Sequence, residues 1–162
     1  MTMQEAQGAA IEAGPYDALS RESAIGLVEQ LADVKSRQLV DDALDIYHPD
    51  GVLLCPPFGS RAHGTDELHR SLTVFFAMMP DYSVTLTGYG MDGTTLCAWG
   101  SIAMTLARTF TGEAPNGQRV ETPVFILFRF RDGKVAWESF HFDLGDVARQ
   151  SGVPASSLEV AR

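Results

Sequence analysis

An Asp-Gly turn between two long runs of alternating residues constrains the fold of this chain more than any other feature. Asp132-Gly133 is typical of a tight β-hairpin turn, because both positions tolerate a positive φ angle. The flanking stretches, Arg119 to Arg131 and Lys134 to Asp143, are rich in aromatic and β-branched residues. The sequence therefore predicts a long antiparallel hairpin near the end of the chain.

A two-residue turn also predicts the register of that hairpin. With uninterrupted pairing, Phe128 faces Trp137 and Val124 faces His141, and side chains alternate between the two faces of the sheet. One face then carries the polar end of the last strand beside an apolar wall. Its expected members are Trp137, Ser139, His141 and Asp143 with Val124, Ile126 and Phe128.

This face is the candidate site. A titratable pair against apolar side chains is the usual composition of a small-molecule pocket, so we expect Asp143 and His141 to be catalytic. In the alternative interpretation, Asp143 is only the N-cap of a short helix over Leu144 to Gln150, and His141 is a hydrogen-bonded core residue. Arg129 and Glu138 are expected on the opposite face as a cross-strand ion pair without a catalytic role.

The N-terminal half has helical spacing, and the rest has the spacing of strands. Ser20 is a plausible N-cap, and Gly64-Thr65-Asp66-Glu67 resembles a helix start with Thr65 as its N-cap. Further hairpin signals are Asp92-Gly93 and Asn116-Gly117. The expected helices are Arg21 to Val34, Leu39 to Tyr47 and Gly64 to Met79, and the expected strands before the final hairpin are Val52 to Pro56, Tyr82 to Leu86 and Thr94 to about Thr111.

Residues 1–15 have no hydrophobic period and are expected to form a flexible tail, followed by a single domain over residues 16–162. The predicted sheet is apolar on both faces, whereas three helices can cover only one. We therefore expect a homodimer through the outer sheet face. That face is predicted to carry Ile102, Met104, Leu106, Phe125, Leu127, Phe140 and Phe142.

The net charge of −9 and the absence of basic clusters exclude partners that need a basic surface. Without a cluster of Lys or Arg there is no basic surface for nucleic acid or an anionic membrane. No segment approaches the roughly 20 apolar residues of a membrane span, so a cytoplasmic protein is expected. Cys55 and Cys97 are expected to be buried free thiols, and the spacing of the four histidines does not resemble a metal site.

Several short strings, taken in order, resemble the SnoaL-like branch of the nuclear transport factor 2-like superfamily. The resemblance spans about residues 20–152. It implies an α+β, cone-shaped fold in which three N-terminal helices pack on a curved, antiparallel-rich mixed sheet, followed by a short C-terminal helix. The matching strings are Tyr47-His48-Pro49-Asp50-Gly51, Gly64-Thr65-Asp66-Glu67, Met79-Pro80-Asp81, Phe110-Thr111-Gly112, Pro115-Asn116-Gly117, the run from Phe128 to Val135, Asp143 and Gln150-Ser151-Gly152.

The resemblance implies a chemistry as well. Polyketide cyclases of this branch use an aspartate near the end of the last strand as acid and base, and Asp143 falls at the similar place. Tyr47 and Phe58 would lie near the pocket mouth. Trp99 is expected in the ligand site as well, because a two-residue turn at Asn116-Gly117 would place it on the face of Val124. The leading hypothesis is a cofactor-independent enzyme acting on an apolar, cyclic or polyketide-like carbonyl compound.

Other members of the superfamily match less well. Ketosteroid isomerases carry an Asp-Pro string where this chain reads Cys55-Pro56-Pro57, without an acid. Limonene epoxide hydrolases need an Arg-x-Asp pair where this chain reads Trp99-Gly100-Ser101. Two alternatives stay open: a non-catalytic ligand-binding or dimerising accessory domain, and an isomerase or hydrolase in which Tyr47 or Tyr89 works with Asp143.

Overall fold

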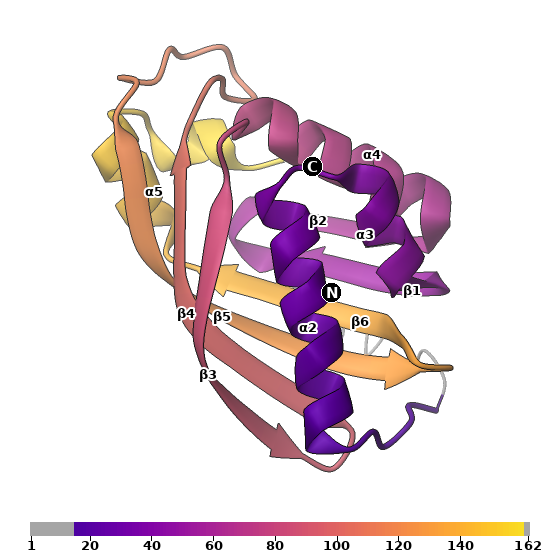
Figure 1. The fold of residues 1–162 in the computed structure, drawn as a ribbon. Coiled ribbons are helices and arrows are strands. Elements are labelled where there is room, and N and C mark those ends of the chain that lie inside the picture. The colour runs from indigo at the N-terminus through magenta and orange to yellow at the C-terminus, as the bar shows by residue number, and fades with distance from the viewer. Residues whose placement is uncertain (1–14, 161–162) are drawn as a thin grey trace, which may run out of the picture.

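A computed structural model describes residues 15–160 of the chain (Figure 1). The predicted flexible tail therefore lies outside the described residues, apart from Pro15. The helices are α2 (Arg21–Ser36), α3 (Val40–Ile46), α4 (Gly64–Met78) and α5 (Leu144–Ser151), with 3-10 turns η1 (Pro56–Phe58) and η2 (Ala155–Leu158). The strands are β1 (Tyr47–Cys55), β2 (Ser60–His63), β3 (Ser83–Asp92), β4 (Thr95–Thr105), β5 (Arg119–Arg131) and β6 (Lys134–Phe142).

The six strands form one open sheet in the order β2-β1-β6-β5-β4-β3. Strand β1 pairs in parallel with β6, and the other neighbours are antiparallel. The sheet curves, and α2, α3 and α4 lie over one of its faces (Figure 1). The predicted α+β arrangement of three helices on an antiparallel-rich mixed sheet, with a short C-terminal helix, is confirmed.

Local capping signals account for the helix starts, with one correction. The Ser20 side chain accepts a hydrogen bond from the Ser23 amide, as predicted for an N-cap. At α4 the N-cap is His63 rather than Thr65; its side chain makes no capping bond, and its amide donates to the Glu67 carboxylate at 2.8 Å. Gly64 then begins the helix with a φ angle of +80°, which glycine adopts without a steric penalty.

The strand predicted to extend to Thr111 ends earlier, and Asn116-Gly117 is not a hairpin turn. Strand β4 stops at Thr105, and the chain then leaves the sheet. The Asn116 amide groups bond instead to the carbonyls of Gln150 and Ser151, each at 2.9 Å. The segment between β4 and β5 is therefore a loop that packs on the end of α5.

The turn of the final hairpin is confirmed, but its register is not. Asp132 and Gly133 have φ angles of +52° and +70° between the paired residues Arg131 and Lys134. After the next pair, Phe130 with Val135, a β-bulge at Ala136 shifts the register. Phe128 therefore pairs with Glu138 rather than with Trp137. A shift of one residue moves every later side chain of the strand to the other face.

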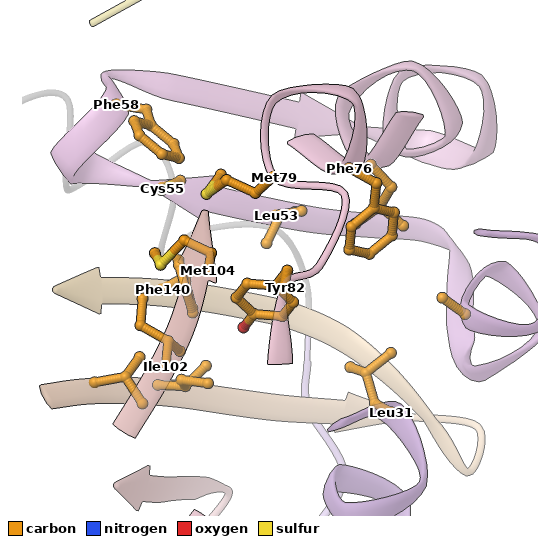
Figure 2. Packing of buried hydrophobic residues seen from close by; sticks show 14 of the residues in the cluster. Leu31, Leu53, Cys55, Phe58, Phe76, Met79, Tyr82, Ile102, Met104 and Phe140 are labelled. Atoms are coloured by element: carbon orange, nitrogen blue, oxygen red, sulfur yellow. The ribbon is translucent and has the colours of Figure 1, made fainter. Parts of the chain in front are cut away.

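The bulge corrects the predicted faces of β6. Trp137, Ser139 and His141 lie on the outer face, opposite Arg129, Leu127 and Phe125, and not beside Val124 or Phe128. Residues that were expected on the outer face lie instead in the core between the sheet and the helices (Figure 2). They include Phe140, which the bulge reverses, and Ile102, Met104 and Leu106, each at most 6% exposed. Ile102 pairs with Thr122 and Met104 with Val120, a register that differs from the one a two-residue turn at Asn116-Gly117 would give. Within residues 15–160, no helix is long and apolar enough to cross a membrane.

Candidate active site

A pocket of about 490 Å³ opens between α4, the β1–β2 hairpin and the inner face of β6. Its walls are mainly apolar, and six of the lining residues are aromatic. Several of the lining side chains appear around Tyr82 in Figure 2. The aromatic lining residues are Phe58, Phe75, Phe76, Tyr82, Phe110 and Phe140.

The aromatic rings meet mostly edge to face. The ring centroids of Phe75 and Tyr82 are 4.9 Å apart at an interplanar angle of 78°, and those of Phe75 and Phe140 are 6.2 Å apart at 85°. In such edge-to-face pairs each ring fixes the orientation of its neighbour, so the pocket wall presents both ring faces and ring edges. The pocket can therefore receive a flat apolar molecule of moderate size.

One carboxylate, that of Glu138, is buried at the inner end of this pocket, and only 1% of its side chain is exposed. The Lys35 ammonium donates to both of its oxygens, at 2.9 and 3.0 Å. The Tyr47 hydroxyl donates to Oε2. A buried carboxylate is costly unless its charge is compensated and it accepts hydrogen bonds. Lys35 compensates the charge, and the three bonds from Lys35 and Tyr47 leave Oε1 with a single donor.

Three separate elements bring these groups together. Lys35 lies in the last turn of α2, where a cation also interacts favourably with the helix dipole. Tyr47 is the first residue of β1, directly after α3 ends. Glu138 points inward only because the bulge at Ala136 reverses the alternation of β6. The bulge is thus what places a charge inside the pocket.

Two tyrosine hydroxyls near Glu138 stay protonated at neutral pH. Burial raises the pKa of Tyr82 well above its usual value, and the charge of Glu138 adds to the effect. The pKa of Tyr47 rises for the same two reasons, burial being the larger. Tyr47 already donates to Glu138, whereas no residue described by the structure accepts from the Tyr82 hydroxyl. Tyr82 is therefore a hydrogen-bond donor available to a ligand in the pocket.

Cys55 also lines the pocket, but burial raises the pKa of its thiol to about 12. At neutral pH it is a thiol rather than a thiolate, and it is a poor nucleophile. Both Cys55 and Cys97 are free, as predicted; Cys55 is buried, whereas Cys97 is partly exposed on the outer face.

The predicted site residues are divided among the pocket, the core and the outer face. Phe58 lines the pocket, and Tyr47 contacts its carboxylate. Val124 and Phe128 are buried in the core beyond the pocket lining. Trp99, which is 39% exposed, covers Gly88 on the outer face. There Trp137 stacks under the Arg129 guanidinium, 4.9 Å from its ring centroid, so the expected pairing of Arg129 with Glu138 is wrong.

His141 and Asp143 do share a depression, but it lies on the outer side of the sheet. This hollow has a volume of about 440 Å³ and also includes the exposed side chain of Phe125. Burial lowers the pKa of His141, and its Nε2 lies 2.6 Å from the Ser139 hydroxyl. Their catalytic roles stay a prediction, with no place for them in the inner pocket.

Asp143 is the N-cap of α5. Its Oδ1 accepts the Asp146 amide at 3.0 Å, which confirms the capping interpretation.

Glu138, Lys35 and Tyr82 were missed as site residues. One signal was available in the sequence: Val135-Ala136-Trp137 is a run of three apolar residues, which interrupts the alternation and is consistent with a bulge. Nothing in the sequence indicates that Lys35 and Tyr47, 103 and 91 residues away, would meet Glu138.

The sequence matches a known protein family, and the fold matches solved structures. The family model described as a SnoaL-like domain matches residues 28–138. No curated protein matches the chain.

Solved structures of low sequence identity share the fold. A protein from Jannaschia sp. CCS1, assigned as a SnoaL-like polyketide cyclase, superposes with a TM-score of 0.73 at 19% identity, over 87% of this chain and 99% of that one. A hypothetical protein from Catenulispora acidiphila with a ketosteroid isomerase-like fold, solved with trimethylamine, gives 0.71 at 18% identity, over 80% and 95%. IdmH from Streptomyces antibioticus, assigned as a polyketide cyclase, gives 0.67 at 19%, over 80% and 98%.

Proposed function

Because this chain belongs to the family of SnoaL-like domains, we propose that it is a small-molecule enzyme of the cyclase or isomerase type. It acts without a cofactor, by acid–base chemistry, on an apolar, cyclic or polyketide-like carbonyl compound. The observation that carries this proposal is the pairing of a carboxylate, Glu138, with an unengaged hydroxyl, Tyr82, on the wall of one aromatic pocket.

In the proposed reaction, the Glu138 carboxylate removes a proton from a carbon next to the substrate carbonyl. The C–H bonding electrons move toward the carbonyl oxygen, which gains negative charge and accepts a hydrogen bond from Tyr82. The resulting enolate carbon then attacks a second carbonyl of the same molecule, whose oxygen takes up the proton from Glu138 as the ring closes, or Glu138 returns the proton to another carbon of the enolate. Lys35 and Tyr47 fix the position of the carboxylate.

The experiment is deuterium exchange into 2-tetralone, an apolar cyclic ketone with acidic C–H bonds, followed by NMR in deuterated water. The native protein should accelerate the exchange. Glu138→Gln should lower the protein-dependent rate by about 100-fold, the usual size of a general-base contribution. Because Glu138→Gln also breaks a buried ion pair, Tyr82→Phe is the second variant, with all charges retained and an expected loss of roughly 100-fold.

Asp143→Asn is the matched control, because it changes a carboxylate of the outer hollow and retains a helix-capping side chain. Its exchange rate should equal that of the native protein. Unchanged rates in both pocket variants, or a loss confined to Asp143→Asn, would contradict the proposal and favour the outer hollow instead.

A second candidate function is a non-catalytic ligand-binding domain. The observation that favours it is the contact of Lys35 with both oxygens of Glu138, because a carboxylate engaged in a buried ion pair has a structural role of its own. This candidate predicts that 2-tetralone binds in the pocket but exchanges no faster than in buffer.

We also propose that the chain forms a homodimer through the outer face of the sheet. Trp99 and Phe125 are 39% and 56% exposed on that face, which the helices leave uncovered. Phe125→Glu should halve the mass measured by light scattering after gel filtration. A native protein with the mass of a single chain would contradict the proposed dimer.

A further inference from the structure

The pocket carries charge at both ends, and the two ends differ. At the inner end, Lys35 and Glu138 are buried and compensate each other. At the outer end lie Arg61 of β2 and Arg70 of α4, both exposed, and neither pairs with any residue that the structure describes. Among residues 15–160, the one further charged lining residue is Glu67, whose carboxylate is bonded to the His63 amide.

These cations are unusual in a chain with 12 Lys and Arg residues against 21 Asp and Glu. The five charged residues of the pocket lining sum to one positive charge, although the whole chain carries −9. A positive opening in a negative protein focuses anions toward the pocket and disfavours cations there.

The rim of the opening also exposes apolar surface. Val74, Phe110 and Val160 are 47%, 40% and 37% exposed, and all three line the pocket. Exposed apolar side chains around a cavity are typical of a ligand-binding opening. Apolar walls and rim combined with two unpaired guanidinium groups suit a ligand with an apolar body and one anionic group.

We infer that the pocket selects a planar apolar compound bearing an anionic group, such as a carboxylate, that is bound at the opening by Arg61 and Arg70. The inference rests on the proposed function, because it concerns the same pocket, and it narrows the substrate class. The ring system occupies the aromatic interior, with its carbonyl chemistry near Glu138 and Tyr82. The guanidinium groups donate charge-assisted hydrogen bonds to the anion.

The test compares 2-naphthoate with 2-naphthamide, which have the same ring system and differ in charge, by isothermal titration calorimetry. The native protein should bind the naphthoate about three to ten times more tightly, because exposed ion pairs contribute modestly. High salt should reduce this preference. In Arg61→Gln/Arg70→Gln, naphthoate should bind only as well as naphthamide, whose affinity should be unchanged.

Arg21→Gln is the matched control. Arg21 is exposed at the start of α2, 14 residues before Lys35, and hence about 21 Å from it along the helix axis. This variant also replaces an exposed arginine by glutamine, although it removes one charge rather than two, and it should keep the native preference for naphthoate.

Equal affinities in the native protein, or a preference that survives in the double arginine variant, would overturn the inference. Binding of naphthamide in either case leaves the pocket of the proposed function intact. Binding of neither compound would contradict both the inference and the proposed ligand pocket.

Discussion

The Tyr47 hydroxyl donates a hydrogen bond to the Glu138 carboxylate in the interior of the protein, across 91 residues of sequence. This bond joins β1 to its neighbour β6, and Lys35 of α2 bonds to the same carboxylate. The stability of the fold and the position of the proposed base therefore depend on the same three side chains.

Tyr47→Phe should lower the free energy of unfolding by about 2 kcal/mol, because it removes a buried hydrogen bond to a charged group. Urea denaturation of the purified variant measures the change. The control is Tyr89→Phe, whose hydroxyl bonds to the exposed Glu29 at 3.1 Å and should cost less than about 1 kcal/mol. Equal losses of unfolding free energy in the two variants would show that the buried Tyr47 bond stabilises the fold no more than the exposed Tyr89 bond does.

Lys35→Met should be more damaging, because it leaves the Glu138 carboxylate buried without its cation. Loss of one partner of a buried ion pair costs roughly 3–5 kcal/mol. Adding Glu138→Leu to Lys35→Met should restore part of that stability, since no uncompensated charge is left. A double-mutant cycle from urea denaturation checks this coupling, and strictly additive losses would contradict it.

Asp143→Ala should lower the free energy of unfolding by about 1 kcal/mol, since it removes the N-cap of α5. Asp143→Asn should cost much less, because the amide oxygen can still accept the Asp146 amide. Denaturation curves of the two variants distinguish the cap from the charge. Equal destabilisation by alanine and asparagine would mean that the carboxylate has another stabilising role.

Stability should fall between neutral and mildly acidic pH in part because of His141. Burial lowers its pKa in the folded protein, so the unfolded chain binds a proton more readily. The stabilising contribution is present above the ordinary pKa near 6.5 and is lost as the pH falls through the lowered folded value. Thermal unfolding at two pH values should show a smaller acid-induced loss for His141→Gln than for the native protein.

His69→Gln is the control for that measurement, because His69 is an exposed histidine on α4 with only a long contact to Asp41. Its acid-induced loss should match that of the native protein. If both histidine variants lose stability with acid as the native protein does, His141 is not the source.

Most of the fold follows from local signals in the sequence. Ser20 caps a helix, Asp132-Gly133 turns a hairpin, and the apolar spacing of the N-terminal half predicts helices, because each signal acts within a few neighbouring residues. The order of helices and strands and the short C-terminal helix were predictable for that reason, whereas the arrangement of three helices on a curved mixed sheet came from the family resemblance. The early end of β4 was not predictable, because the backbone amides of Ala107 and Phe110, just beyond it, bond to the distant carbonyls of Met78 and Ser157.

The site was less predictable because one inserted residue decides it. Ala136 adds a residue to β6, and the face assigned to His141 becomes the outer face. Glu138 therefore points into the interior, where its charge is tolerated only because Lys35 of α2 and Tyr47 of β1 bond to it. Alternation along a strand identifies which residues share a face, but not a bulge that exchanges the two faces.

The central claim is that ligand chemistry occurs in the inner pocket at Glu138. The most direct measurement is a crystal structure of the protein soaked with 2-naphthol, a planar phenol that resembles the enol of 2-tetralone. The account predicts the rings beside Phe75 and Phe140, with the phenol oxygen within hydrogen-bond distance of Tyr82 or Glu138. Binding in the outer hollow beside His141 and Asp143, with the inner pocket empty, would contradict it.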